Sequence, residues 1–178
     1  MEEPTRAEAI ATLQEGDAKL RGLLDGVGEG ALERAATIGG GDWSAKDLVG
    51  HIQSWEGFAV RTVEEWQRRE EPWILQAAFS GAGGEKVDAL NASTYERTKG
   101  MRPGEVLQEY ERTHAELIAL LGGMPDERWN EGPFWPAPEE RRDRLGSLLG
   151  SVLGAPHRPF GHAFAHLPNL SDYVASLR

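Results

Sequence analysis

The sequence spaces its histidines in a way that suits a metal site. His162 and His166 lie four residues apart, which puts both imidazoles on one face of a helix, one turn apart. His51 lies on the apolar stripe of another expected helix, so its side chain is expected to point inward. Three imidazoles are a ligand set that zinc and nickel accept, and they leave a coordination position open for water or substrate.

The spacing alone leaves a second interpretation open. A pair of histidines four residues apart arises by chance in a short chain that contains five histidines. A single histidine on an apolar stripe is commonly a core residue that hydrogen-bonds a backbone carbonyl. The residue types and their spacing therefore indicate a metal site without excluding ordinary core histidines.

The helix that carries His51 has the strongest signals in the chain. Ser44 is suited to cap it, and Asp47 occupies its third position, where a carboxylate satisfies free N–H groups and favours the positive end of the helix dipole. The helix is expected to end near Arg69, before Pro72. Its apolar stripe comprises Leu48, His51, Ile52, Trp55, Phe58, Ala59, Val63 and Trp66.

Three further long helical segments complete a bundle. They are expected over about Thr5–Leu24, Pro103–Leu121 and Leu145–Ser176, the last broken near Gly154-Ala155-Pro156 and perturbed again at Pro168. A short helix is expected over Lys86–Arg97, with loops at 70–84 and 124–138. We therefore predict an all-α single domain over residues 1–178. It is an antiparallel four-helix bundle with an additional short helix and a long loop rich in proline and tryptophan.

Composition narrows the classes of function. The net charge of −10 argues against a nucleic-acid partner, because phosphate neutralisation needs clustered Lys and Arg. No apolar run approaches the roughly 18–20 residues that cross a bilayer, so no membrane partner is expected. The absence of cysteine excludes disulfides and thiolate chemistry by the protein itself. The N-terminus lacks the cationic and apolar stretches of a secretory signal, so a cytoplasmic location is expected.

Several segments resemble the DinB/YfiT-like superfamily. The stretch Gly41-Asp42-Trp43-Ser44-Ala45-Lys46-Asp47-Leu48-Val49-Gly50-His51-Ile52 is similar to its GWSxxDLxxH signature. His162-Ala163-Phe164-Ala165-His166 resembles its HxxxH element on the last core helix. Leu90-Asn91 and Pro103-Gly104-Glu105-Val106-Leu107 resemble members related to mycothiol-dependent maleylpyruvate isomerase and the ClbS/DfsB group.

The resemblance implies a four-helix bundle in which His51, His162 and His166 bind a divalent metal, commonly zinc or nickel. Members with known activity include thiol-dependent S-transferases and isomerases, and ClbS-type members protect against a DNA-damaging metabolite. Many relatives carry an acid or tyrosine inside the HxxxH element, whereas this chain has Ala163, Phe164 and Ala165. Any acid–base partner must therefore come from elsewhere, and Pro168 is expected to tilt the turn that bears the ligands.

Several other residues are candidates for supporting roles. Glu56 and Asp172 are candidates to accept from the ligand imidazoles, although surface acids are commoner on such helices. His157 is expected to be a loop residue and His114 a core residue. Trp43, Trp55 and Trp66 are expected in the core. Trp129, Phe134 and Trp135 either wall a pocket or pin the long loop to the bundle, and Arg141, Arg142 and Arg144 either bind a carboxylate or face solvent.

Three functions compete. The first is a metal-dependent enzyme that acts on a small-molecule substrate, by thiol-dependent S-transfer or isomerisation or by hydrolysis, with a low-molecular-weight thiol as a further cofactor. The second is a non-catalytic, ClbS-like bundle that sequesters a reactive small molecule without tight metal. The third is a structural bundle. A homodimer is a common assembly for bundles of this kind.

Overall fold

The computed structural model describes residues 3–39, 41–80, 83–137, 143–154 and 158–178, and these are helical with no β-strand. The all-α fold expected from the sequence is confirmed. The helices are α1 (Arg6–Leu24), α2 (Glu29–Leu32), α3 (Ala45–Gln67), α4 (Trp73–Ala77), α5 (Gly83–Thr98), α6 (Pro103–Gly122), α7 (Asp126–Trp129), α8 (Leu145–Val152) and α9 (His162–Ala175).

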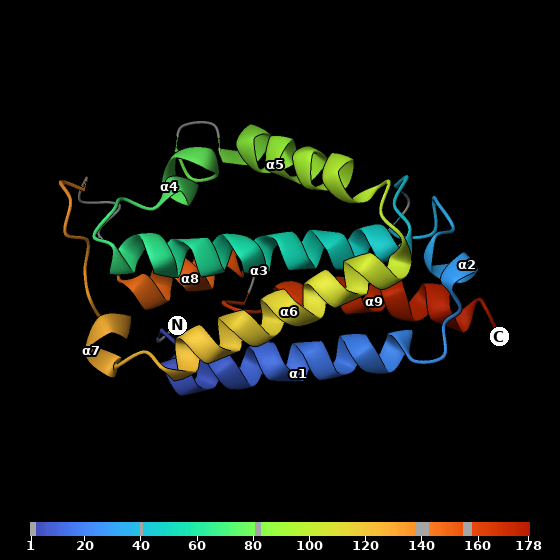
Figure 1. The fold of residues 1–178 in the computed structure, drawn as a ribbon, viewed down its shortest axis with the longest axis horizontal. Coiled ribbons are helices and arrows are strands. Elements are labelled where there is room, and N and C mark those ends of the chain that lie inside the picture. Colours follow the sequence, from blue (N-terminus) through green and yellow to red (C-terminus); the bar gives the residue numbers. More distant parts are fainter. Residues whose placement is uncertain (1–2, 40, 81–82, 138–142, 155–157) are drawn as a thin grey trace.

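Helix α3 lies at the centre of the bundle and contacts α4, α5, α6, α8 and α9. Helices α1 and α9 run in one direction, and α3 and α6 run in the other (Figure 1). The fourth position of the bundle is divided between α8 and α9, which lie end to end behind α3 and α6 (Figure 1). Helix α5 packs on the outer side of α3 and returns the chain to the end where α6 begins.

Capping boxes start both α1 and α3. The Thr5 N–H donates to Glu8 Oε2 at 2.8 Å, and the Glu8 N–H donates back to Thr5 Oγ1 at 3.3 Å. In α3, the Ser44 N–H donates to Asp47 Oδ2 at 2.9 Å, and the Asp47 N–H donates to Ser44 Oγ at 3.2 Å. Because this start is defined, the position of His51 around the axis of α3 is also defined.

The structure differs from the sequence prediction in the connections. Short helices α4 and α7 form inside the expected loops at 70–84 and 124–138, and α2 follows α1. Between α8 and α9 the break is wider than expected, since α8 ends at Val152 and α9 begins at His162. Pro168 lies on the exposed side of α9 and does not end the helix, although it removes the N–H that would donate to the Phe164 carbonyl.

The apolar core has two parts, with polar side chains between them. One part includes Trp55, Leu117 and Leu149, and the other includes Ile52 and Leu170. Buried Glu56 of α3 and His114 of α6, with partly buried Asp17 of α1, lie along the chain between members of the two parts. His51 directly precedes Ile52, so along α3 it lies close to this boundary between the two parts of the core.

Candidate metal centre

Three histidines meet in the middle of the bundle. His51 Nε2 lies 2.9 Å from His162 Nε2, and His166 Nε2 lies 3.2 Å from the same atom. One nitrogen of each ring falls within 4.8 Å of the others, so the cluster could hold a metal ion. His51 comes from the second turn of α3 and the other two from the first turns of α9. The structure therefore brings together the three residues that the sequence and the resemblance single out.

Packing against α1 sets the rotation of α9. A Cβ placed on Gly16 of α1 would lie 3.2 Å from Ala163 Cβ and 3.3 Å from the Phe164 ring, so α1 and α9 approach closely at this glycine. Because Ala163 and Phe164 face α1, the histidines on either side of them face α3. The residues inside the HxxxH element thus serve packing rather than acid–base chemistry.

Burial keeps these imidazoles neutral. It lowers the pKa of His51 to about 3, with a further contribution from His166. The pKa of His162 lies well below its usual range because of burial and the two neighbouring imidazoles, and burial also lowers the pKa of His166. Neutral imidazole is the form that ligates a metal. The cluster is therefore poised to bind a cation without first losing protons near neutral pH.

The spacing of the nitrogens fits tetrahedral coordination. Metal–nitrogen bonds of about 2.0–2.1 Å at tetrahedral angles place ligand nitrogens ~3.3 Å apart. The two short separations in the cluster, 2.9 and 3.2 Å, lie within a few tenths of an ångström of that value.

The expected carboxylate partners do not reach this site. Glu56 points instead to His114, whose Nδ1 lies 3.1 Å from both carboxylate oxygens, and Asp172 is exposed on α9. Among the described residues, nothing hydrogen-bonds the buried Nδ1 atoms of His51 and His162. The interpretation of His114 as a core histidine is confirmed, and its partner is the acid that was a candidate for the metal ligands.

Two hollows flank the histidines. An apolar one of about 270 Å³ is lined by all three histidines with Trp55, Phe79, Val87, Asn91 and Val152 among its walls. A more polar one of about 560 Å³ includes His166, Asn91, Trp43, Tyr95, Asp42 and Asp88. The site is therefore open to a small molecule from two sides.

The tryptophans expected in the core divide between two roles. Trp66 is fully buried. Trp55 is also buried, but its ring stands 6.4 Å from that of His51 and 6.0 Å from that of His162, so it walls the site. Trp43 precedes α3, lies 5.0 Å from the His51 ring and stacks on Tyr95. The prediction that Trp43 is a core residue is wrong, because it is only partly buried and lines the polar hollow.

Helix α5 supplies site residues that the sequence interpretation missed. Val87, Asn91 and Tyr95 recur every four residues and face the site, a periodicity that would have indicated the inward face of this helix. Buried Lys46 fixes the helix, since its Nζ donates to the carbonyls of Lys99 at 2.8 Å and Met101 at 3.2 Å just after α5 ends. Polar anchoring at this end holds α5 against α3.

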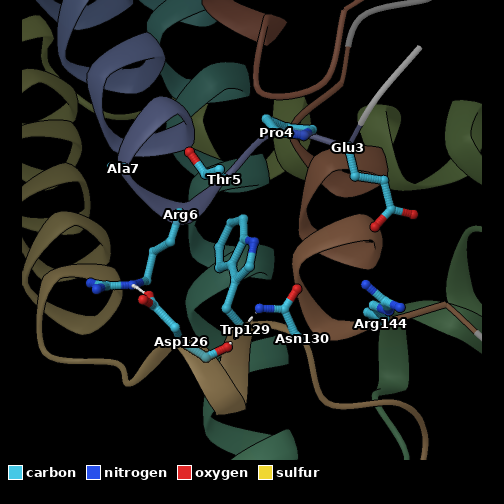
Figure 2. Close-up of a pocket in the computed structure, with 9 residues that line it drawn as sticks. All are labelled: Glu3, Pro4, Thr5, Arg6, Ala7, Asp126, Trp129, Asn130 and Arg144. Carbon is cyan, nitrogen blue, oxygen red and sulfur yellow. Dashed lines mark hydrogen bonds and ion pairs between the residues drawn. The ribbon is translucent and has the colours of Figure 1, made fainter.

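The described residues of the Pro- and Trp-rich segment at 124–138 do not contribute to the histidine site. Phe134 and Trp135 pack on Trp66, with ring centroids 5.6 and 5.0 Å from it, so they pin the loop to the bundle. Trp129 and Arg144 line a separate hollow of about 710 Å³ near the start of α1, and none of the three histidines lines it (Figure 2). Arg141, Arg142 and His157 lie outside the described residues.

The bundle and its site define a class of helical protein with a three-histidine centre, and comparison with known proteins gives the family. A sequence profile of the DinB superfamily matches residues 12–154. The chain belongs to the DinB superfamily. The match includes His51 and ends before His162. The placement of His162 and His166 beside His51 therefore rests on the structure. No curated protein matches the chain.

Solved structures share the fold at low sequence identity. An uncharacterised protein from Escherichia coli UTI89 aligns with a TM-score of 0.73 at 15% identity, over 97% of this chain and 94% of that one. The colibactin self-resistance protein ClbS, in complex with double-stranded DNA, aligns at 0.65 and 13% identity, over 97% and 93%. A protein from Streptococcus pneumoniae aligns at 0.62 and 10% identity, over 99% and 92%.

These findings bear on the expectations that the protein has no nucleic-acid partner and no membrane partner. Because ClbS was solved with DNA, the charge-based exclusion of nucleic acid gains no support from the comparison. Among the described residues, none of the helices combines the length and the apolar character that crossing a membrane requires.

Proposed function

We propose that this protein is a divalent-metal-dependent enzyme that acts on a small molecule at His51, His162 and His166. The observation that carries the proposal is the convergence of three neutral imidazoles, one nitrogen of each within 4.8 Å of the others, beside a hollow of about 270 Å³. Zinc or nickel is the cation that this all-nitrogen donor set favours.

The surroundings of the site suit nucleophilic chemistry by an exogenous group. A cation held by three histidines lowers the pKa of a water or thiol bound to it toward neutrality. The chain has no cysteine, so a thiol nucleophile would arrive as a low-molecular-weight cofactor. The apolar walls of Trp55, Phe79 and Val87 would exclude bulk water from the reacting groups. Thiol-dependent transfer or isomerisation and hydrolysis are both compatible with this arrangement.

One observation favours a second candidate, a ClbS-like protein that sequesters a reactive small molecule without tight metal. Ligand histidines commonly donate their second nitrogen to a carboxylate or carbonyl, and loss of that partner typically weakens metal affinity by about 10- to 100-fold. His51 Nδ1 and His162 Nδ1 have no such partner among the described residues. This protective role is the alternative when the metal is weak or absent.

Metal content separates the two candidates. Purified tag-free protein, His51→Ala and His166→Ala would be measured by plasma mass spectrometry after incubation with zinc or nickel and removal of free ion. We expect about one metal per wild-type chain and loss of that metal in both variants. Thr113→Ala, a buried polar substitution on α6, is the control that should retain the metal.

Circular dichroism of each variant would establish that the helical fold is kept. Wild-type protein that stays empty after incubation with either metal would contradict the metalloenzyme proposal and leave the sequestering protein as the better explanation.

A further inference from the structure

The apolar hollow beside the histidines contains one polar side chain whose orientation is fixed. Trp55 Nε1 lies 3.0 Å from Asn91 Oδ1. An indole N–H can only donate, so the atom that faces it must be the amide oxygen and not the amide nitrogen. Because Trp55 is buried and packs against Phe58, at 5.5 Å between ring centroids, the indole is itself held in place.

This bond leaves the Asn91 NH2 group free to act as a donor. No acceptor for Asn91 Nδ2 occurs among the described residues, although the side chain lines both hollows that flank the histidines. An amide whose oxygen already accepts from a buried indole offers a ligand two free N–H donors beside one remaining oxygen lone pair, so it acts mainly as a donor. The site thus presents a hydrogen-bond donor at the junction of its two hollows, next to the histidine cluster.

The charge of the walls restricts what can bind. Among the described residues that line the two hollows there is no lysine or arginine, and the polar hollow adds Asp42 and Asp88. A carboxylate or phosphate placed there would lose hydration without gaining a cation from the chain, which is costly. The chain's own residues therefore favour a ligand without negative charge.

We propose that the site takes an uncharged, largely apolar compound with a carbonyl-type acceptor, and that Asn91 orients it by donating to that acceptor. This inference rests on the proposed small-molecule function of the site. Trp55 is a positioning residue, because it acts by holding the Asn91 amide. The hollow of about 270 Å³ is large enough for a single substituted ring, since an apolar cavity of about 150 Å³ holds one benzene.

Three probes of similar size separate the contributions of charge and hydrogen bonding. They are acetophenone, which is neutral with a carbonyl, ethylbenzene, which lacks an acceptor, and benzoate, which is anionic. Their dissociation constants would be measured on the full chain by ligand-observed NMR, with chelator-treated protein as the primary sample. We expect acetophenone to bind about five-fold or more tightly than ethylbenzene, the effect of one hydrogen bond, and more tightly than benzoate.

Asn91→Asp is the sharpest variant. Its carboxylate can still accept from Trp55 and has nearly the same shape, but it offers the ligand an acceptor where Asn91 offers a donor. We expect the preference for acetophenone over ethylbenzene to disappear at pH 8. Asn130→Asp makes the same change in the distant hollow of Figure 2 and should leave the preference intact.

Trp55→Phe provides a second test, because it removes the indole N–H without touching Asn91. We expect it to lower the acetophenone preference by freeing the amide. Three results would overturn the inference: benzoate binding as tightly as acetophenone, an unchanged preference in Asn91→Asp, or no acetophenone binding to wild-type chain. Because the primary sample contains no metal, these outcomes do not depend on whether the metalloenzyme proposal holds.

Discussion

His51 and His114 are both buried imidazoles, yet their neighbours shift their pKa values in opposite directions. Around His51 stand two other imidazoles and Trp55, so burial acts without compensation and lowers the pKa. Burial is the largest single influence on His114 and disfavours its charged form, but the hydrogen bond to Glu56 and the charges of Glu56 and Asp17 together outweigh burial and raise the pKa. The same residue type thus forms a neutral cluster at one place and a pair with a carboxyl group at another.

The His114 pair predicts a pH-dependent stability. The pKa of His114 in the folded state is raised above the unfolded value near 6.5. The stabilisation of the fold by this pair is therefore fully present below pH 6.5 and is lost as the pH rises through the folded-state pKa of His114. Burial raises the pKa of Glu56, which acts in the same direction. We expect His114→Gln to cost about 3 kcal/mol near pH 6, as for loss of one partner of a buried pair, and less at pH 9.

Urea denaturation of wild-type and variant proteins from pH 6 to pH 9 would measure this difference. Thr113→Ala removes a neutral buried side chain from the same helix and should give a loss that does not vary with pH. Parallel curves for wild type and His114→Gln would show that the pair does not carry the expected charge.

At the scale of elements, α8 depends on a glycine at its contact with α7. The Trp129 indole lies so close to Gly146 that a Cβ there would fall 2.6 Å from Trp129 Nε1. Trp129 is only 5% exposed, so it has little room to move aside. This contact joins the loop after α6 to the helix that leads into α9 and its two histidines.

Gly146→Ala is therefore expected to destabilise the protein by about 1–3 kcal/mol through overpacking, despite the better helix propensity of alanine. Gly122→Ala is the matched control, because Gly122 is also helical but has nothing within 4 Å of its added Cβ. It should be neutral or slightly stabilising. Thermal denaturation would compare the two, and equal midpoints would show that Trp129 can move at little cost.

At the scale of the whole molecule, the site lies where the two parts of the core meet. His51 comes from α3, the pair from α9, and Asn91 from α5, which packs on the other side of α3. A ligand bound here would contact residues of three helices, α3, α5 and α9. Binding should therefore stabilise the entire bundle rather than one segment of it.

Zinc is expected to raise the unfolding free energy by about 2.7 kcal/mol at a free concentration 100 times its dissociation constant. For a chain of this size that corresponds to a rise of roughly 5–10 °C in the thermal midpoint. His162→Ala should abolish the rise, and magnesium, which prefers oxygen ligands, should not produce it in wild type. An equal response of wild type and variant to zinc would place the metal elsewhere.

Local patterns determined much of what could be predicted from the sequence. The caps at Thr5 and Ser44 specify where α1 and α3 begin, because capping joins residues only three apart. The period of 3.6 residues then places His51 on an inward face and puts His162 beside His166. For this reason the long helices and the three histidines could be predicted from the sequence. The family resemblance supplied the link between the two histidine segments.

Only the tertiary structure decided which side chains meet across helices. His51 and His162 are 111 residues apart, Glu56 and His114 are 58 apart, and Trp55 and Asn91 are 36 apart. The rotation of each helix about its axis sets these pairs, and it depends on close contacts such as Gly16 with Ala163, which no local pattern specifies. The sequence accordingly made Glu56 a candidate partner of the metal ligands, whereas helix packing places its carboxylate against His114.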